Sequence, residues 1–278
     1  MRFAASPYVH PTCCPVTAMQ HTDFPVPDYH ALLDYDGPAD LLADRVILIT
    51  GAAHGIGHAV ALRYARHGAR LVLLDWDRAG LEALSDQIVA QGSAEPVLCP
   101  ADLSGITIGG VREITDRVGE RFGRLDGLLN NAAWVGALAP FEHYPPAAWT
   151  KVMNINLAAP FFLTQWCMPL LRKAPDPVVG FSLQQVSRAY WGAFAMAKAG
   201  QQALIGVLAD EYRADSAHPV RVFGVDTGPV LTPGRRQHYP GEALDAHPQP
   251  ERVTGPYLYA VGPEARGHSP LLLGGGDG

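Results

Sequence analysis

The chain has few charged residues and very few lysines. Charged residues make up 17% of the 278 residues, hydrophobic residues make up 48%, and the formal net charge is −6. The apolar content is sufficient for a substantial core, which excludes an intrinsically disordered chain. The lysines, Lys151, Lys173 and Lys198, are scattered, and no Lys/Arg cluster forms the basic stripe that nucleic-acid binding needs. Nucleic acid is therefore not an expected partner.

Cysteines are scarce, and long apolar runs are missing. Cys13, Cys14, Cys99 and Cys167 do not make a disulfide framework in a chain of this length. The vicinal pair beside His10 matches no zinc-binding pattern, so no metal site is expected. No run reaches the roughly 18 apolar residues of a membrane span. These features predict a cytoplasmic protein that does not associate with membranes.

The first 43 residues differ from the rest of the chain. They contain six prolines and show no sustained periodicity, which predicts a poorly ordered arm over 1–43, followed by one domain over 44–278. Prolines at positions 7, 11 and 15 also interrupt the apolar stretch that a secretory signal requires. Met1 and Met19 both remain open as the natural start.

From residue 45 onward, short apolar runs alternate with longer helical patterns. The expected strands are Val46–Thr50, Arg70–Leu74, Val97–Cys99, Leu125–Leu129, Val178–Ser182 and Val220–Val225. The expected helices are Ile56–His67, Arg78–Gln91, Val111–Phe122, Trp149–Leu171 and Trp191–Arg213. Such alternation predicts an α/β fold with a parallel sheet covered on both faces, a Rossmann-type doubly wound sheet in a single domain.

A glycine-rich segment, Thr50–Gly57, lies between the first strand and the first helix. Glycines allow a tight turn and close approach to a pyrophosphate, and the helix N-terminus supplies free N–H donors. Asp75 ends the second strand, 18 residues after Gly57. A carboxylate there accepts the ribose hydroxyls and repels a 2′-phosphate, and no lysine or arginine in the loop offsets this repulsion. The sequence therefore favours NAD(H) over NADP(H), unless Asp75 is a solvated carboxylate at a strand end.

These segments together resemble the short-chain dehydrogenase/reductase family. The matching motifs are Thr50–Gly57, Asp102-Leu103, Asn130-Asn131-Ala132-Ala133, Asn156, Phe194-x-x-x-Lys198, Val225–Thr232 and Leu271–Gly276. The resemblance covers nearly everything from residue 45 to the end and implies the fold already expected. It implies cofactor contacts at Thr50, Gly51, Gly55, Ile56, Gly57, Asp75, Asp102, Leu103, Asn130, Ala132, Lys198 and Thr232.

The catalytic motif departs from the family at one atom. The family uses a tyrosine hydroxyl to transfer a proton to or from the substrate oxygen, and Phe194 stands at that position. The resemblance gives Lys198 and Asn156 their family roles in ribose binding and proton relay. The family serine, which steadies the substrate oxygen, lies about thirteen residues before the tyrosine; Phe181 has that offset here, and Ser182, twelve residues before Phe194, is the candidate for this role. Tyr190 shares a face with Phe194 only if the helix extends back to it.

Two functions therefore stay open. The first is an NAD(H)-dependent oxidoreductase that acts on a small alcohol or carbonyl compound, with impaired or non-standard chemistry because of Phe194. The second is a catalytically silent NAD(H)-binding homologue that serves as a sensor, partner subunit or scaffold. The resemblance also implies a homodimer or homotetramer formed through the helices Trp149–Leu171 and Trp191–Arg213. Residues Pro229–Arg252 occupy the family's substrate-lid position, where Arg235-Arg236 is either a solvated turn or a site for an acidic group.

Overall fold

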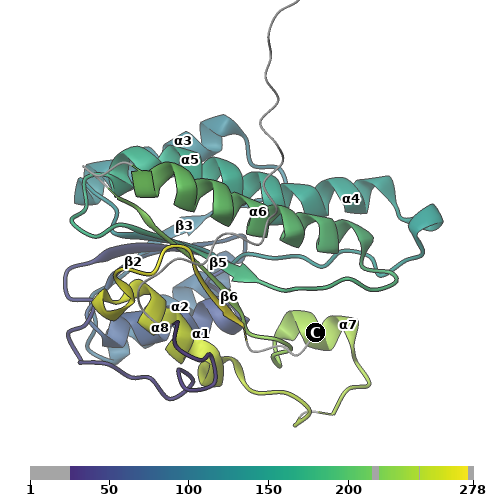
Figure 1. Cartoon of the computed structure of the whole chain (residues 1–278), viewed down its shortest axis with the longest axis horizontal. Coiled ribbons are helices and arrows are strands. Elements are labelled where there is room, and N and C mark those ends of the chain that lie inside the picture. The colour runs from purple at the N-terminus through teal and green to yellow at the C-terminus, as the bar shows by residue number, and fades with distance from the viewer. Residues whose placement is uncertain (1–25, 215–218, 244, 275–278) are drawn as a thin grey trace, which may run out of the picture.

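The computed structural model describes residues 26–214, 219–243 and 245–274, which form a parallel sheet between two layers of helices (Figure 1). The strand order is β3-β2-β1-β4-β5-β6-β7. The strands are β1 Val46–Thr50, β2 Arg70–Asp75, β3 Val97–Pro100, β4 Gly127–Asn130, β5 Val178–Leu183, β6 Arg221–Asp226 and β7 Leu271–Gly274. The order reverses between β1 and β4, and ligands of such sheets bind beyond the carboxyl ends of the strands at this point.

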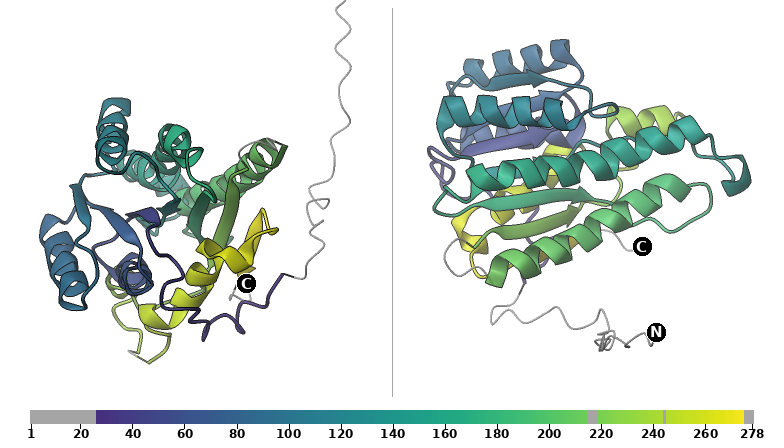
Figure 2. Two further views of the ribbon diagram at one scale, coloured as in Figure 1. Left: turned by 90° about the vertical axis from the view of Figure 1, so that its left-hand side faces the viewer. Right: turned by 90° about the horizontal axis from the view of Figure 1, so that it is seen from above.

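Helices cover both faces of the sheet. They are α1 Gly55–Arg66, α2 Arg78–Ala90, α3 Ile108–Phe122, α4 Pro146–Met153, α5 Ala159–Leu171, α6 Gly192–Ala214, α7 Pro233–His238 and α8 Thr254–Val261. One layer contains α3, α5 and α6, and the other contains α1, α2 and α8 (Figures 1 and 2). Three short 3-10 turns, Phe141–His143, Pro250–Val253 and Pro263–Ala265, complete the described elements.

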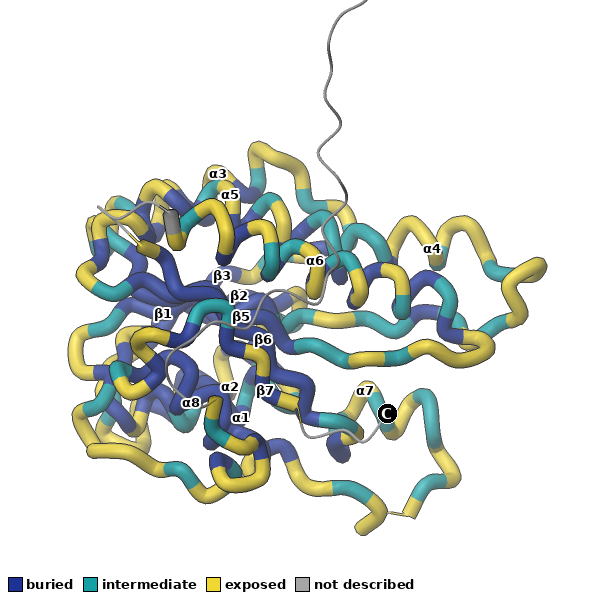
Figure 3. The backbone as a smooth tube through the Cα atoms, in the orientation of Figure 1, coloured by how far each residue is buried: buried dark blue, intermediate teal, exposed yellow. Residues whose placement is uncertain are grey.

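The central strands β1, β4, β5 and β6 are buried along almost their whole length (Figure 3), whereas the edge strands β3 and β7 are partly exposed. In β1, Ile47 and Ile49 belong to the core beneath α1 and α8, while Val46 and Leu48 belong to the core beneath α3 and α5. Side chains that alternate between two apolar cores require apolar residues at successive positions. This arrangement confirms the predicted α/β fold with one doubly wound parallel sheet.

The predicted long helix over 149–171 is interrupted in the structure. A π-helical segment, Asn154–Ala158, separates α4 from α5. Apolar periodicity continues across the break, but the family resemblance implies a kink at Asn156, which lies within this segment. A π-turn inserts an extra residue and changes which backbone carbonyls are paired, and such segments are common at functional sites.

The N-terminal segment 26–43 differs from the predicted arm. The side chains of Tyr29, Leu32 and Leu42 are buried in the core that contains α1 and α8. A Cβ atom on Gly255 would lie 2.0 Å from the carbonyl oxygen of Leu32, so the segment lies directly against α8. The prediction of disorder is therefore wrong for 26–43, because three isolated side chains anchor turns that have no regular periodicity. Residues 1–25, with Met19, His10, Cys13 and Cys14, lie outside the described residues.

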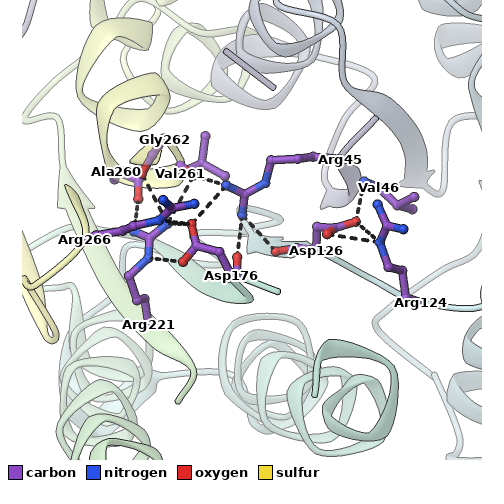
Figure 4. Close-up of polar contacts among 10 residues, drawn as sticks. All are labelled: Arg45, Val46, Arg124, Asp126, Asp176, Arg221, Ala260, Val261, Gly262 and Arg266. Atoms are coloured by element: carbon purple, nitrogen blue, oxygen red, sulfur yellow. Dashed lines mark hydrogen bonds and ion pairs between the residues drawn. The ribbon is translucent and has the colours of Figure 1, made fainter. Parts of the chain in front are cut away.

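A group of arginines surrounds Asp176 at the amino edge of the sheet (Figure 4). Asp176 Oδ1 accepts a hydrogen bond of 2.8 Å from Arg221 Nε, and Oδ2 accepts bonds of 3.1 Å from Arg221 and 3.0 Å from Arg266. Arg45 Nη1 lies 3.4 Å from Asp176 Oδ2 and donates to the carbonyl of Val261 at 2.9 Å. The cluster therefore joins the starts of β1, β5 and β6 to the end of α8.

The same contacts favour the ionised carboxylate of Asp176. Burial alone would raise its pKa, but hydrogen bonds from Arg221 and the charges of Arg221 and Arg45 lower the pKa below its ordinary value. A carboxylate with a lowered folded-state pKa contributes stability above its unfolded pKa. That contribution is lost as the pH falls through the folded-state pKa.

We expect Asp176→Asn to lower the free energy of unfolding by about 3 kcal/mol at neutral pH, because partly buried guanidinium groups would lose their counter-charge. Urea unfolding of both proteins between about pH 3 and pH 7 checks this. The wild type should lose more stability below about pH 4 than the variant. Identical stability at neutral pH, or parallel pH curves, would contradict the expectation.

Candidate functional site

Asn131 joins the ends of β1, β4 and β5 at the carboxyl edge of the sheet. Its side-chain Nδ2 donates to the carbonyls of Thr50 at 3.0 Å and Gly51 at 3.1 Å. Its backbone N–H donates to Thr50 Oγ1 at 3.0 Å, and its Oδ1 accepts from Ser182 Oγ at 2.9 Å. Ala132 N–H also donates to Thr50 Oγ1 at 3.0 Å. The glycine loop is therefore fixed to the two strands beside it.

The glycine loop has the shape that a phosphate group requires. Gly51 and Gly55 have φ angles of +67° and +57°. A Cβ atom on Gly57 would lie 2.1 Å from the carbonyl oxygen of Gly51, so only glycine fits there. His54 makes no capping bond to α1, because its Nε2 lies 2.7 Å from Asp77 Oδ2. The N–H groups of the first turn of α1 therefore lack a side-chain acceptor, and they fit a pyrophosphate.

Thr232, a predicted cofactor contact from the segment after β6, lies close to the glycine loop. A Cβ atom on Gly55 would be 3.1 Å from Thr232 Cγ2. Thr232 Oγ1 accepts from Arg235 N–H at 3.1 Å and so caps α7. The end of β6 and the glycine loop are therefore adjacent, as the predicted cofactor set requires.

Asp75 is held by backbone groups. It is 7% exposed; its Oδ2 accepts from Ala53 N–H at 3.0 Å and its Oδ1 from Asp77 N–H at 3.1 Å. Both carboxylate oxygens therefore have partners inside the protein. The next residue, Trp76, is 73% exposed.

The remaining predicted cofactor residues lie around the same edge. Asp102 Oδ1 accepts from Ser104 N–H at 2.8 Å, and this bond lowers the pKa of Asp102. Leu103 is buried and Ile56 is partly buried. Asn130 Nδ2 donates to Thr164 Oγ1 at 3.2 Å, while its buried Oδ1 has no hydrogen-bond partner among the described residues.

Phe194 lies inside an apolar cluster at the start of α6. We name as the Phe194 cluster the buried residues Val152, Trp191, Ala193, Phe194 and Ala197 with the partly buried Trp134, Val135, Tyr144, Met153, Leu157, Val186, Ala195 and Tyr239. The Phe194 ring is 2% exposed and makes an edge contact with Trp191 at a centroid distance of 5.7 Å. Lys198 Nζ is 5.6 Å from the centroid of the Phe194 ring. The ring has no group that transfers a proton.

Lys198 is one member of a buried polar chain that leads to Asn156. Its Nζ donates to the carbonyl of Ser182 at 2.7 Å and to Gln201 Oε1 at 3.2 Å. Gln201 Nε2 in turn donates to the carbonyl of Asn156 in the π-helical segment. The sequence analysis missed Gln201, although its position three residues after Lys198 places both on one helix face.

The side chain of Asn156 fixes the chain beyond β4. Asn156 Nδ2 donates to the carbonyls of Val152 at 2.8 Å and Trp134 at 2.9 Å, and its Oδ1 accepts from Trp134 N–H at 3.2 Å. The structure therefore brings Lys198, Asn156 and Phe194 into one region, as predicted. Their individual roles remain predictions.

The hydroxyl of Ser182 faces the other helix layer. It donates to Asn131 and accepts from the hydroxyl of Tyr257, on α8, at 3.0 Å. Phe181 and Leu183, its neighbours on β5, pack in the core beneath α3 and α5. Because strand side chains alternate, Ser182 presents its carbonyl to Lys198 and its hydroxyl to α8. Its predicted contact with a substrate oxygen gains no support from this geometry, and no sequence signal pointed to Tyr257.

Tyr190 does not share a helix face with Phe194. Helix α6 begins at Gly192, and Tyr190 precedes it with a φ of +75° and 56% exposure. The condition for Tyr190 to share a helix face with Phe194, a helix that extends back to residue 190, is therefore not met.

The segment after β6 forms an ion-paired lid beside the Phe194 cluster. Arg235 donates two hydrogen bonds of 2.6 and 2.7 Å to Glu242, and His247 Nε2 lies 2.8 Å from Glu242 Oε1. The bonds from Arg235 lower the pKa of Glu242 to about 2. Tyr239, between these residues, packs against the Phe194 cluster. Arg235 is therefore an internal ion-pair partner, whereas Arg236 is exposed.

Comparison with known proteins agrees with this geometry. Residues 45–243 match the family described as short chain dehydrogenase. The chain belongs to this family. The uncharacterised oxidoreductase YciK of Escherichia coli K12 is 33% identical over 237 residues, which cover 84% of this chain and 92% of YciK. A short chain dehydrogenase structure from Pseudomonas syringae is 39% identical, with a TM-score of 0.82, over 87% of this chain and 98% of its own.

Two related structures contradict the predicted preference for NAD(H). A short chain dehydrogenase from Escherichia coli CFT073 in complex with NADPH is 32% identical and has a TM-score of 0.81, covering 86% of this chain and 99% of its own. One from Shigella flexneri 2a in complex with NADP is 32% identical with a TM-score of 0.81, covering 85% and 98%. The prediction read Asp75 as a free carboxylate, whereas its oxygens bind the N–H groups of Ala53 and Asp77.

The described residues 26–214, 219–243 and 245–274 show neither a membrane-spanning helix nor a metal-ligating cluster. No helix there is long and apolar enough to cross a membrane. The described side chains also contain no group of three or more metal-ligating residues that could hold a metal ion.

The pKa of Lys198 gives a test of its burial. Burial lowers the pKa of Lys198 to about 8 from an ordinary 10.5, although the charge of Asp226 opposes the shift. Between these values the unfolded chain binds more protons, so the stability of the wild type should rise with pH. Lys198→Met should lack this rise, which amounts to at most about 3 kcal/mol. Urea unfolding between about pH 7 and pH 10.5 measures the difference, and superimposable slopes would contradict it.

Proposed function

We propose that this protein binds NADP(H) and slowly interconverts a small alcohol and its carbonyl compound. The observation that carries the proposal is the contact between the buried Lys198 and the ring of Phe194. This contact lies at the carboxyl edge of the sheet, the same edge as the glycine loop. The residues around the glycine loop form a site that fits a dinucleotide, while the position that the family uses for proton transfer holds a hydrocarbon ring.

Several observations support a dinucleotide at this edge. Gly57 lets the start of α1 pack against the carbonyl of Gly51, where any Cβ would collide, and the first turn of α1 has no side-chain cap. Asn130 Oδ1 is buried without a partner among the described residues. Both carboxylate oxygens of Asp75 are engaged by backbone N–H groups, and Arg78, the first residue of α2 after β2, would supply positive charge for a 2′-phosphate. The related structures with NADP and NADPH support the same cofactor.

The residues of this chain would bind the cofactor but would not supply a proton. NADP(H), when bound, supplies or accepts the hydride. Lys198 would hold the nicotinamide ribose and place positive charge beside the reacting centre. Phe194 neither donates nor accepts a proton, so the proton of the substrate oxygen must exchange with water. The absence of a positioned acid–base group typically lowers the rate by about 10²–10⁴-fold.

One observation favours a second function, that of a catalytically silent NADP(H)-binding homologue. The Phe194 ring is 2% exposed, with Trp191 at its edge and the lid residue Tyr239 in the same cluster. A substrate reaches this ring only if the cluster opens. A protein whose cluster stays closed would bind the dinucleotide and act as a sensor, partner subunit or scaffold.

We expect Phe194→Tyr to raise carbonyl reductase activity with NADPH by at least about tenfold, since it restores a proton donor beside Lys198. Activity is measured on a panel of aromatic and aliphatic aldehydes and ketones, together with the affinity for NADPH. Phe194→Leu is the matched control and should bind NADPH normally without a gain in rate. If the wild type is inactive and the tyrosine variant gains nothing, the silent function is favoured.

We expect NADPH to bind more tightly than NADH in calorimetric titrations of the wild type. Gly57→Ala should abolish the binding of both, because the added methyl group would collide with the carbonyl of Gly51 in the phosphate loop. Circular dichroism and thermal unfolding show whether the variant still folds. Tighter binding of NADH would sink the cofactor proposal.

We also infer self-association through the layer of α4, α5 and α6. Trp149 on α4, Phe161 on α5, and Met196 and Val207 on α6 are large apolar side chains with 45–51% exposure. Apolar side chains of this size on neighbouring helices favour burial against another copy of the chain. The homodimer or homotetramer remains a prediction.

A further inference from the structure

Arg188 is an uncompensated cation at the edge of the Phe194 cluster. It lies in the connection between β5 and α6, and its side chain is exposed. Its guanidinium carbon is 5.0 Å from the centroid of the Trp191 ring, and its Nη2 donates to the hydroxyl of Tyr239 at 3.3 Å. No ion pair joins Arg188 to a carboxylate among the residues that the structure describes.

Arg235 provides an internal comparison, because it contacts the same tyrosine. Its guanidinium carbon is 4.8 Å from the centroid of the Tyr239 ring, but its charge is neutralised by two hydrogen bonds to Glu242. Two guanidinium groups therefore meet Tyr239, and only one has a carboxylate partner. The lid contributes its acidic residue to Arg235 and leaves Arg188 positively charged.

The position of Arg188 relates it directly to the candidate site. Trp191, which carries the guanidinium on its face, contacts Phe194 at 5.7 Å between ring centroids. Tyr239 also belongs to the Phe194 cluster. A single aromatic ring thus separates the cation from the position where the family transfers its proton. A molecule that enters the opened Phe194 cluster would meet apolar side chains along its body and positive charge at one end.

The contacts also orient the guanidinium group. The cation–π contact with the indole ring and the bond to Tyr239 hold the group at two points, and the bond uses one of its five N–H donors. The donors that remain form the planar fork that binds a carboxylate through two hydrogen bonds. A lysine at this position would supply charge without this geometry.

We propose that Arg188 binds the carboxylate of the substrate, so that the substrate is a carbonyl or alcohol compound with an apolar body and a distant carboxylate group. This inference rests on the proposed function, since it names the substrate class of that site. Arg188 acts here as a specificity-determining residue, and the apolar part of the substrate contacts Trp191 and its neighbours in the Phe194 cluster.

The test compares 4-formylbenzoate with methyl 4-formylbenzoate, which share one aromatic aldehyde and differ in charge. Binding to the full chain is measured by NMR titration, with and without saturating NADP⁺, so that no reduction takes place. The wild type should bind the carboxylate about tenfold more tightly than the ester. Arg188→Gln should lose this preference and keep its affinity for the ester, while Arg188→Lys should keep only part of the preference.

Arg236→Gln is the matched control. It removes an exposed arginine of α7, for which the structure gives no contact with Tyr239 or Trp191, and it should keep the full preference. Equal affinity of the wild type for the two probes, no binding of either probe, or an undiminished preference in Arg188→Gln would each overturn the inference. A protein that shows the preference but fails to bind NADP⁺ in calorimetry would refute the proposed function and leave the carboxylate site standing.

Discussion

The side chain of Asn131 joins the glycine loop to β4 and β5, and the arrangement of the candidate site at the carboxyl edge depends on this connection. One amide group bonds to the glycine loop after β1 and to the hydroxyl of Ser182 on β5, while its own backbone follows β4. Tyr257 extends the same network into the opposite helix layer. The distance between the phosphate loop and the region of Lys198 is therefore set by a few short hydrogen bonds across three strands.

The region around Lys198 is held by hydrogen bonds, although the residue at position 194 is not a proton donor. Gln201 and the π-helical segment hold the ammonium group in place, and Asn156 holds the loop after β4. A hydrocarbon ring at position 194 makes the surroundings of the lysine more apolar, which agrees with its lowered pKa. The candidate site is thus organised around a buried ammonium group that faces a hydrocarbon ring.

The sequence predicted the features that depend on local pattern. Continuous apolar strands and the spacing of Thr50–Gly57, Asp75 and Lys198 were sufficient to predict the sheet and the region of the site. Features that depend on long-range partners were missed. The hydrogen bond from Ala53 to Asp75 and the face on which Ser182 lies follow from the packing of the sheet. The turns anchored by Tyr29 and Leu42 were also missed, because their apolar residues do not recur at helical or strand spacing.

The contact between Gly255 and the carbonyl of Leu32 has a consequence for where this protein can be divided. The family match covers residues 45–243, whereas the core beneath α1 includes Tyr29, Leu32 and residues 257–261 of α8. A fragment cut at the limits of the match would leave the face of α1 bare and remove the partner of Ser182. Residues on both sides of the family match are thus needed to complete the hydrophobic core of this protein.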